Sequence, residues 1–235
     1  MIGLEGANDG QGCVGSVLAV MVQHELPLPF AEWFSDDPMR CDKDLTVTMV
    51  VSDDPNVVEA ALRAGRLSCG CGSRLAPWGY GRSRCLRDAG GQTRPQRPRR
   101  ARCTACGTTT VLLADWSLPR RRDTIEVIGA ALLAHAQGVG HRPIAKRLGV
   151  PEGTVRGWLR RVRKNAEWLR VWATVLAHDC DPLLHPIRPT GSPVGDTVEA
   201  LGTAAKALKL RLGDRGGWPT IVALTHGRLL GTRSL

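Results

Sequence analysis

The sequence lacks any apolar run that could cross a membrane. Its only apolar stretch near the start, residues 14–22, is about nine residues long and has no basic residue before it. A membrane-spanning helix needs about 20 apolar residues, and a secretion signal begins with a basic segment. These absences exclude a membrane partner and predict a cytoplasmic protein.

Acidic residues are scarce beyond residue 60, where 30 basic residues accompany only 11 acidic ones. The first 60 residues have the opposite balance, with 2 basic and 11 acidic residues. The net charge is therefore about −9 up to residue 60 and about +19 after it. A strongly basic body indicates a polyanionic partner, and DNA or RNA is the usual candidate.

Residues 1–48 also lack a sustained period of 2 or 3.6 and are rich in Gly, Asp and Pro. We interpret residues 1–53 as a poorly ordered leader, with Met39 and Met49 as alternative starts. Pro55 then suits the first turn of a short helix that ends near Gly65.

Eight cysteines without a secretion signal favour thiols and metal over disulfides. Four of them form two close pairs, Cys69-Gly-Cys71 and Cys103-Thr-Ala-Cys106, with 31 residues between the pairs. A glycine after each pair permits a left-handed turn, so the four thiolates can converge on one tetrahedral Zn²⁺. Short alternating stretches nearby predict small antiparallel strands. Residues 54–118 are therefore predicted to form a zinc ribbon behind a short helix, with too little core to fold without the ion.

The first pair has a one-residue spacer instead of the common two, which leaves other arrangements open. Cys85 could replace one of the four ligands, or the thiols could be buried without a metal. A second site could use His178, Cys180 and His185. Catalytic zinc is not expected, because four thiolates leave no open coordination position.

Arginines cluster before the second cysteine pair and again before the helical part of the chain. Solvated, solubilising charge is the simplest interpretation, but such blocks repel themselves unless an anion neutralises them, so phosphate binding is favoured. The predicted phosphate contacts are Arg97, Arg99, Arg100, Arg102, Arg120, Arg121 and Arg122.

Residues 141–160 have the pattern of a helix-turn-helix. Two steeply crossing helices need a small residue at their contact and a turn residue that accepts positive φ, and Ala145 and Gly149 fill these positions. An Asp-x-x-Glu capping pattern at Asp123 predicts a helix before them. Residues 119–164 are therefore predicted to form a three-helix unit that places its last helix in the major groove of double-stranded DNA. An ordinary helical hairpin is the alternative. The apolar residues expected inside are Ile144, Leu148, Val150, Val155 and Trp158.

The last helix of this unit carries the predicted base contacts. Arg156 and Arg160 lie one turn apart and can each donate two hydrogen bonds to a guanine edge. Thr154 and Arg161 are further candidates for DNA binding. Two glycines on the same helix cannot read bases, so phosphate contacts are expected to supply much of the affinity.

Residues 165–235 are predicted to form a C-terminal helical region that ends in a short helix from Trp218 to near Gly231. Within it, apolar residues at steps of three and four form a stripe that serves either as a homodimer or partner interface or as a packing face. The stripe consists of Val194, Val198, Leu201, Ala205, Leu208 and Leu212. The whole pattern predicts a mainly α fold with a small β zinc ribbon, a helix-turn-helix unit and C-terminal helices.

The order of these parts and the string from Gly149 to Arg161 resemble uncharacterised bacterial proteins encoded near transposase and integrase genes, over about residues 55–230. Residues 67–163 are also similar to the front end of insertion-sequence transposases of the InsA type. Such transposases continue into a catalytic domain with three metal-binding carboxylates. Too little chain follows here for that domain, so no independent enzymatic activity is expected.

These features predict a nucleoid-associated protein that binds DNA, either to recognise the ends of a mobile element or to regulate transcription. Two alternatives remain open. The chain could be a targeting subunit for a separately encoded transposase or integrase, or its zinc ribbon could bind RNA or another protein.

Overall fold

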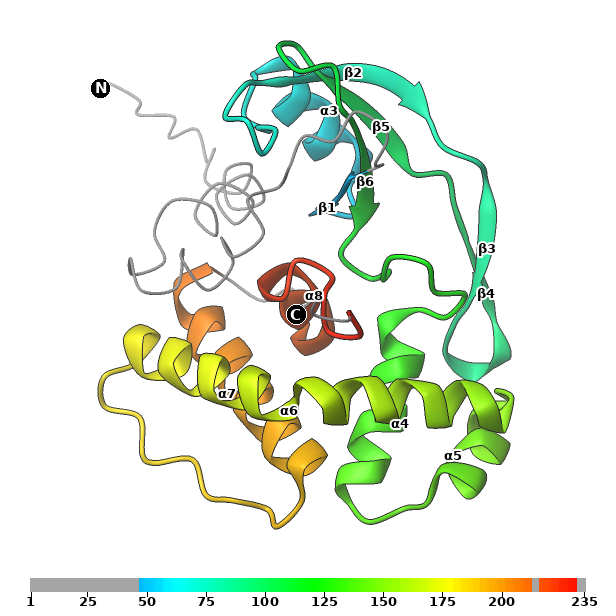
Figure 1. Cartoon of the computed structure of the whole chain (residues 1–235), viewed down its shortest axis with the longest axis vertical. Coiled ribbons are helices and arrows are strands. Elements are labelled where there is room, and N and C mark those ends of the chain that lie inside the picture. Colours follow the sequence, from blue (N-terminus) through cyan, green and yellow to red (C-terminus); the bar gives the residue numbers. More distant parts are fainter. Residues whose placement is uncertain (1–46, 213–215, 232–235) are drawn as a thin grey trace, which may run out of the picture.

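The computed structural model describes residues 47–212 and 216–231, which form six helices and two small sheets. About half of these residues are helical. Figure 1 shows a β-rich part at the top of the view and a helical part at the bottom. The predicted leader lies outside the described residues up to residue 46.

The β-rich part is a four-stranded mixed sheet in the order β1-β6-β5-β2. Strands β2 (Leu75–Tyr80), β5 (Arg99–Cys103) and β6 (Thr109–Ala114) are antiparallel neighbours, as the alternating sequence predicts. Strand β1 (Val47–Val51) pairs in parallel with β6. This sheet is the scaffold that holds the four cysteines.

Strand β1 corrects the predicted end of the leader, because residues 47–51 belong to the sheet and not to a poorly ordered segment. The stretch Val-Thr-Met-Val-Val is rich in β-branched residues, which favour strands. Its partner lies about 60 residues away, with Val47 opposite Thr110. Parallel pairing at this distance leaves no local turn signal in the sequence.

Helix α3 (Pro55–Arg63) confirms the predicted short helix. The carboxylate of Asp54 accepts a hydrogen bond from the Asn56 amide at 2.8 Å and caps the helix, and Pro55 occupies its first turn. Gly65 follows the helix with φ of 65°, a conformation that suits glycine. The buried face of α3 packs in the small core of the β-rich part.

A second, two-stranded sheet is formed by β3 (Arg84–Arg87) and β4 (Thr93–Gln96). It runs down from the four-stranded sheet to the helical part (Figure 1). Leu86 is fully buried in the core of the helical part. The backbone of Arg87 donates to the Arg122 carbonyl and accepts from the Thr124 amide. The β3–β4 hairpin therefore joins the two parts of the molecule.

Five helices make up the helical part: α4 (Ile125–Ala136), α5 (His141–Leu148), α6 (Glu152–Cys180), α7 (Pro193–Leu212) and α8 (Gly217–Leu224). Helix α6 continues without a break beyond residue 164, where the domain boundary was predicted. No Gly or Pro interrupts it after Gly157, and its buried residues continue as far as Ala177. The predicted C-terminal region therefore shares one long helix with the helix-turn-helix.

The apolar stripe on α7 is a packing face. Val194, Val198, Leu201, Ala205 and Leu208 are all buried in the core of the helical part, and α7 packs against α6. These side chains are thus covered by the chain itself, so a homodimer would need another surface. The side chain of Leu212, the last residue of the predicted stripe, is not among those that the structure describes. The last predicted element is shorter than expected, because α8 ends at Leu224 instead of near Gly231.

The start of α4 differs from the predicted capping pattern. The residue that precedes the helix is Thr124, and no side chain caps the first turn. Asp123 instead lies 3.5 Å from the guanidinium of Arg87, and the Thr124 hydroxyl donates to Asp88 at 2.8 Å. Asp123 and Thr124 therefore bind residues of the β3–β4 hairpin and of the turn between its strands. The local capping motif does not reveal these long-range contacts.

Within the described residues, no helix is both long enough and apolar enough to span a membrane.

Candidate metal centre and helix-turn-helix surface

The sulfur atoms of Cys69, Cys71, Cys103 and Cys106 all lie within 4.8 Å of one another. Two pairs are closer, with 3.7 Å between the Cys69 and Cys106 sulfurs and 3.4 Å between those of Cys71 and Cys103. Four sulfurs around Zn²⁺ at about 2.3 Å stand about 3.8 Å apart in a tetrahedron. The quartet therefore has the size and the donor atoms of a four-coordinate metal site.

Two tight turns bring the thiols together, as the glycines predict. Gly72 and Gly107 have φ of 83° and 75°. The Gly72 amide donates to the Cys69 carbonyl at 2.8 Å, and the Gly107 amide donates to the Cys103 carbonyl at 3.2 Å. The short spacer of the first pair is thus accommodated by a turn that directs both sulfurs to the same side.

The cysteines differ in exposure. Cys69 and Cys103 are buried in the small core, whereas Cys71 is exposed. The backbone amide of Ser73 and then the thiol of Cys103 lower the pKa of Cys71. A lowered pKa favours the thiolate, which is the form that binds metal.

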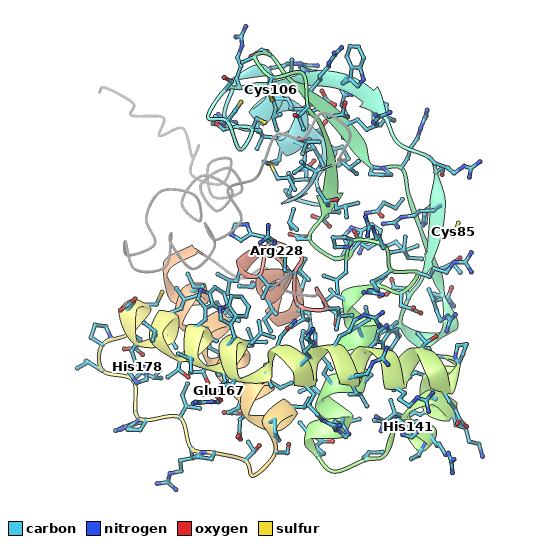
Figure 2. The ribbon with its side chains drawn as sticks, in the orientation of Figure 1. Cys85, Cys106, His141, Glu167, His178 and Arg228 are labelled. Carbon is cyan, nitrogen blue, oxygen red and sulfur yellow. The ribbon has the colours of Figure 1, made fainter. Side chains whose placement is uncertain are left out.

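The alternative ligand sets do not form. Cys85 lies exposed on β3, away from Cys106, as Figure 2 shows. The quartet is the only cluster of three or more potential metal-binding side chains among residues 47–212 and 216–231. His178 accordingly contacts the Thr174 carbonyl of its own helix at 2.8 Å, and no site with Cys180 and His185 is formed.

The second and third helices of the predicted unit, α5 and α6, meet at a left-handed turn. Gly149 has φ of 62°, and the Val150 amide donates to the Ala145 carbonyl at 3.0 Å. Pro151 directly precedes the first residue of α6. The predicted inner residues are buried, except for Leu148, which is partly buried against the same core. The second helix, the turn and the third helix of the predicted unit are therefore present, with the predicted small contact residue and turn glycine.

Residues 124–167 match the homeodomain-like domain family. The match covers α4, α5 and the first half of α6, which are the three helices predicted from the sequence. No curated protein and no solved structure matches the chain. The chain therefore contains a domain of the helix-turn-helix type at residues 124–167.

The outer side of the homeodomain-like domain presents Arg156 and Arg160. Both are exposed, and neither guanidinium makes a hydrogen bond or an ion pair with the described residues. Thr154 is partly buried. Glu152 lies 3.6 Å from Arg142 of α5 in a solvent-exposed ion pair, so its negative charge is partly compensated.

The predicted phosphate contacts fall into two groups. Arg97, Arg99 and Arg102 lie on the ribbon, where their guanidinium groups stand 4.7 to 5.1 Å from the centroids of exposed aromatic rings. Arg99 also forms an ion pair with Glu59, whereas Arg100 is partly buried on the same strand. Arg97, Arg99 and Arg102 are thus held in position by contacts with other residues of the β-rich part.

The second group lies at the junction of the two parts. Arg120 and Arg122 are exposed and Arg121 is partly buried, and Arg120 and Arg121 line a cavity together with Arg161. Arg161 donates to the Gly157 carbonyl of its own helix at 3.2 Å. Because successive residues of a helix are about 100° apart, Arg161 lies well away from the face that carries Arg156.

Sequence reasoning missed two exposed aromatic residues on β2. Trp78 and Tyr80 are 51% and 52% exposed, which is unusual for large rings. Trp78 stacks with Arg102, and Tyr80 lies beneath Arg97 and Arg99. The signal was present as two aromatic residues separated by one glycine, opposite an arginine-rich strand.

Proposed function

We propose that this chain binds double-stranded DNA through the homeodomain-like domain, with the first turns of α6 in the major groove. The observation that carries the proposal is the exposed pair Arg156 and Arg160, one turn apart on the outer side of the matched helix-turn-helix. Their guanidinium donors have no partner among the described residues, so they can form paired hydrogen bonds with guanine edges.

We also propose that the cysteine quartet holds a structural Zn²⁺. The supporting observations are the four converging sulfurs and the glycine turns that direct them. When bound, the ion would cross-link the turn before β2 to the turn after β5. The exposed arginines near these strands, such as Arg97 and Arg102, would then contact phosphates beside the site read by α6.

The biological role that these surfaces favour is recognition of mobile-element ends or regulation of transcription, within the nucleoid and without a catalytic centre of the chain's own. Helix-turn-helix domains of the matched family are found in transposases, which supports a link with mobile elements. A targeting subunit for a separately encoded transposase or integrase is an alternative, and co-purification with a nuclease would support it.

One observation favours a second candidate function, binding of single-stranded RNA or DNA by the ribbon. Exposed aromatic rings combined with arginines are the usual platform on which unpaired bases stack. Trp78 and Tyr80 provide such rings on β2. Replacing Trp78 with Ala would weaken binding to a single-stranded oligonucleotide by about 5- to 100-fold if the ring stacks on a base.

The test of the leading proposal is the double variant Arg156→Ala/Arg160→Ala of the metal-loaded full chain. Fluorescence anisotropy with a preferred duplex and with a scrambled duplex, at several salt concentrations, would measure the change. Each lost guanine contact costs about 1–3 kcal/mol of discrimination, so the preference should fall at least about 20-fold. Residual, salt-sensitive binding should remain through phosphate contacts.

The matched control is Arg188→Ala, which removes an exposed arginine outside the homeodomain-like domain. It should keep the preference of the unchanged protein. An unaltered preference in the double variant would exclude α6 as the reading element.

A further inference from the structure

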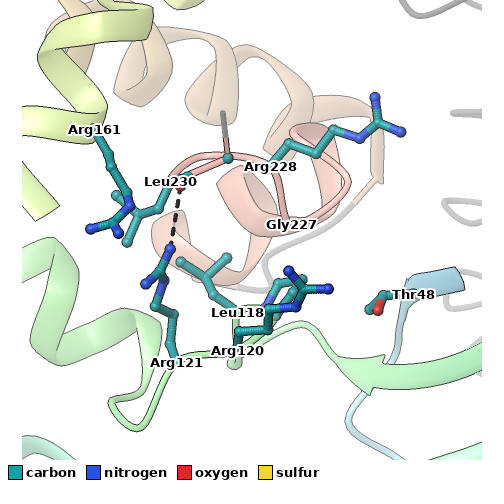
Figure 3. A pocket seen from close by; sticks show the side chains of 10 residues that line it. Thr48, Leu118, Arg120, Arg121, Arg161, Gly227, Arg228 and Leu230 are labelled. Atoms are coloured by element: carbon teal, nitrogen blue, oxygen red, sulfur yellow. Dashed lines mark hydrogen bonds between the residues drawn. The ribbon is translucent and has the colours of Figure 1, made fainter. Parts of the chain in front are cut away.

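A cavity of about 470 Å³ lies where the ribbon, the homeodomain-like domain and the C-terminal residues meet. Its volume is in the range of small-molecule sites. Four arginines line it: Arg120 and Arg121 from the segment after β6, Arg161 from α6, and Arg228 after α8. Figure 3 shows these side chains around the cavity together with Thr48 of β1.

No acidic residue lines this cavity, although four positive groups border it. None of the five ion pairs within residues 47–212 and 216–231 involves these arginines. The guanidinium groups of Arg120 and Arg228 also make no hydrogen bond to the described residues. Like charges that border one cavity and have no ion-pair partner among the described residues repel one another, and a bound anion would reduce that repulsion.

Arg121 provides an independent indication that the cavity suits an anion. One of its terminal nitrogens donates to the Leu230 carbonyl at 3.4 Å, but its buried Nε has no acceptor among residues 47–212 and 216–231. Buried polar groups nearly always have a partner, and a charged donor without one is especially unfavourable. Burial, Arg161 and Arg120 together lower the pKa of Arg121, as expected when the positive charge lacks compensation.

The remaining features of the cavity suit an oxygen-rich anion. Arginine donates paired hydrogen bonds in a plane, which matches the oxygens of a phosphate group. Arg120 has φ of 57°, an uncommon conformation for a residue other than glycine, so its position costs free energy that the site must offset. Strained backbone of this kind often marks a binding site.

We propose that this cavity binds a phosphate group through Arg120, Arg121, Arg161 and Arg228. The phosphate belongs either to a free anion or to the backbone of bound DNA, and the same four arginines serve both. In either case the group would connect the segment after β6 to α6 and to the residues after α8. Occupancy would thus stabilise the junction between the two parts, independently of base reading by α6.

The first arm of the test uses inorganic phosphate and the metal-loaded full chain. Thermal unfolding is followed while phosphate replaces chloride at constant ionic strength. Specific binding predicts a rise in the midpoint that grows with the logarithm of the phosphate concentration above Kd, by about 5–10 °C at a concentration on the order of 100 times Kd. Phosphate also stabilises proteins by exclusion from their surfaces, but that effect grows in proportion to the phosphate concentration and is the same in all variants.

The variant Arg228→Ala should lose the logarithmic rise, because it removes one exposed guanidinium from the cavity. Arg188→Ala, which removes the same charge elsewhere, should keep it. Arg161→Gln provides a second variant whose side chain preserves much of the packing on α6. Far-ultraviolet circular dichroism and metal content would show that each variant is folded.

The second arm compares the affinity of these variants for duplex DNA. Unchanged affinity in Arg228→Ala together with a lost phosphate response identifies a free anion as the ligand. A loss of about 5-fold or more relative to Arg188→Ala, without a response to free phosphate, identifies a DNA phosphate. If Arg228→Ala and Arg188→Ala show the same response to phosphate and the same affinity for duplex DNA, the cavity is not a phosphate site. Because Arg228 lies outside the homeodomain-like domain, failure of the cavity and failure of DNA reading by α6 remain distinguishable.

Discussion

The β-rich part and the helical part of this chain are stabilised in different ways. The buried apolar cluster of the β-rich part has ten residues, and two of them are Cys69 and Cys103. The helical part has a continuous cluster of 33 buried residues that includes Trp158 and Trp172. A core as small as the first is rarely sufficient for folding, whereas the second is of ordinary size. We therefore expect a metal to be essential for folding of the β-rich part and dispensable for folding of the helical part.

Metal removal should produce the largest effect. Structural zinc contributes about 10–16 kcal/mol in small zinc-binding peptides, which exceeds the stability of most domains. A chelator, or Cys103→Ser, should therefore unfold the four-stranded sheet and leave α6 and α7 folded. Amide hydrogen exchange would show this as lost protection in β2, β5 and β6 and retained protection in the two helices.

Cys85→Ser is the matched control, because Cys85 is exposed and lies outside the quartet. Its metal content and exchange protection should equal those of the unchanged protein. Loss of protection throughout the molecule on chelation would contradict the division into a metal-dependent and a metal-independent part.

The reverse experiment is a cavity in the helical core. Trp158 is 1% exposed, so Trp158→Ala should lower the free energy of unfolding of the helical part by about 3–5 kcal/mol. The same substitution at Trp78, which is 51% exposed, should cost less than about 1 kcal/mol. Denaturant unfolding monitored by circular dichroism would measure both, and equal losses would argue against the two-core description.

Acid should weaken the helical part through His226. Burial, and secondarily Arg228, lowers the pKa of His226 to about 4. Below pH of about 6.5 the unfolded chain binds a proton that the folded chain does not. Stability is therefore fully present above that pH and falls as the pH approaches 4, by up to about 3 kcal/mol. Denaturation at several pH values would measure the slope.

His226→Asn should flatten this slope, because asparagine does not titrate and tolerates the positive φ of 48° at this position. An unchanged pH dependence in that variant would assign the acid sensitivity to other groups, such as the carboxylates of the β-rich part.

The smallest expected effect concerns the connection between the two parts. Arg87 donates to the Gly149 carbonyl at 3.1 Å and lies 3.5 Å from the buried carboxylate of Asp123. Its side chain is one third exposed, so solvent screens the pair, and Arg87→Ala should cost about 1–2 kcal/mol. The exposed neighbour Arg82 is the control, and Arg82→Ala should leave the free energy of unfolding within about 0.5 kcal/mol. A double-mutant cycle with Asp123→Asn would isolate the pair.

Local signals in the sequence predicted much of the fold. The helix-turn-helix was found because a small residue, a turn glycine and an apolar set coincide within 20 residues, and the family match at residues 124–167 supports it. The cysteine quartet was found because its spacing and its glycines are local. The stripe on α7 had two interpretations, and burial in the chain's own core shows that it is a packing face.

The features that escaped prediction depend on contacts between distant residues. The pairing of Val47 with Thr110 joins segments about 60 residues apart, and no turn announces it. Asp123 matched a capping motif, yet its side chain forms an ion pair with Arg87 on strand β3. Arg121 and Arg161 were predicted as separate DNA contacts, but the fold brings them to one cavity with Arg228. In each case the sequence shows the residue type but not its neighbour.

The most direct test of the account is selection of bound fragments from random duplex DNA by the metal-loaded protein, in parallel for the unchanged chain and for Arg156→Ala/Arg160→Ala. The account predicts a defined motif containing guanine for the unchanged chain and no enriched motif for the double variant. Recovery of the same motif by both proteins would contradict it.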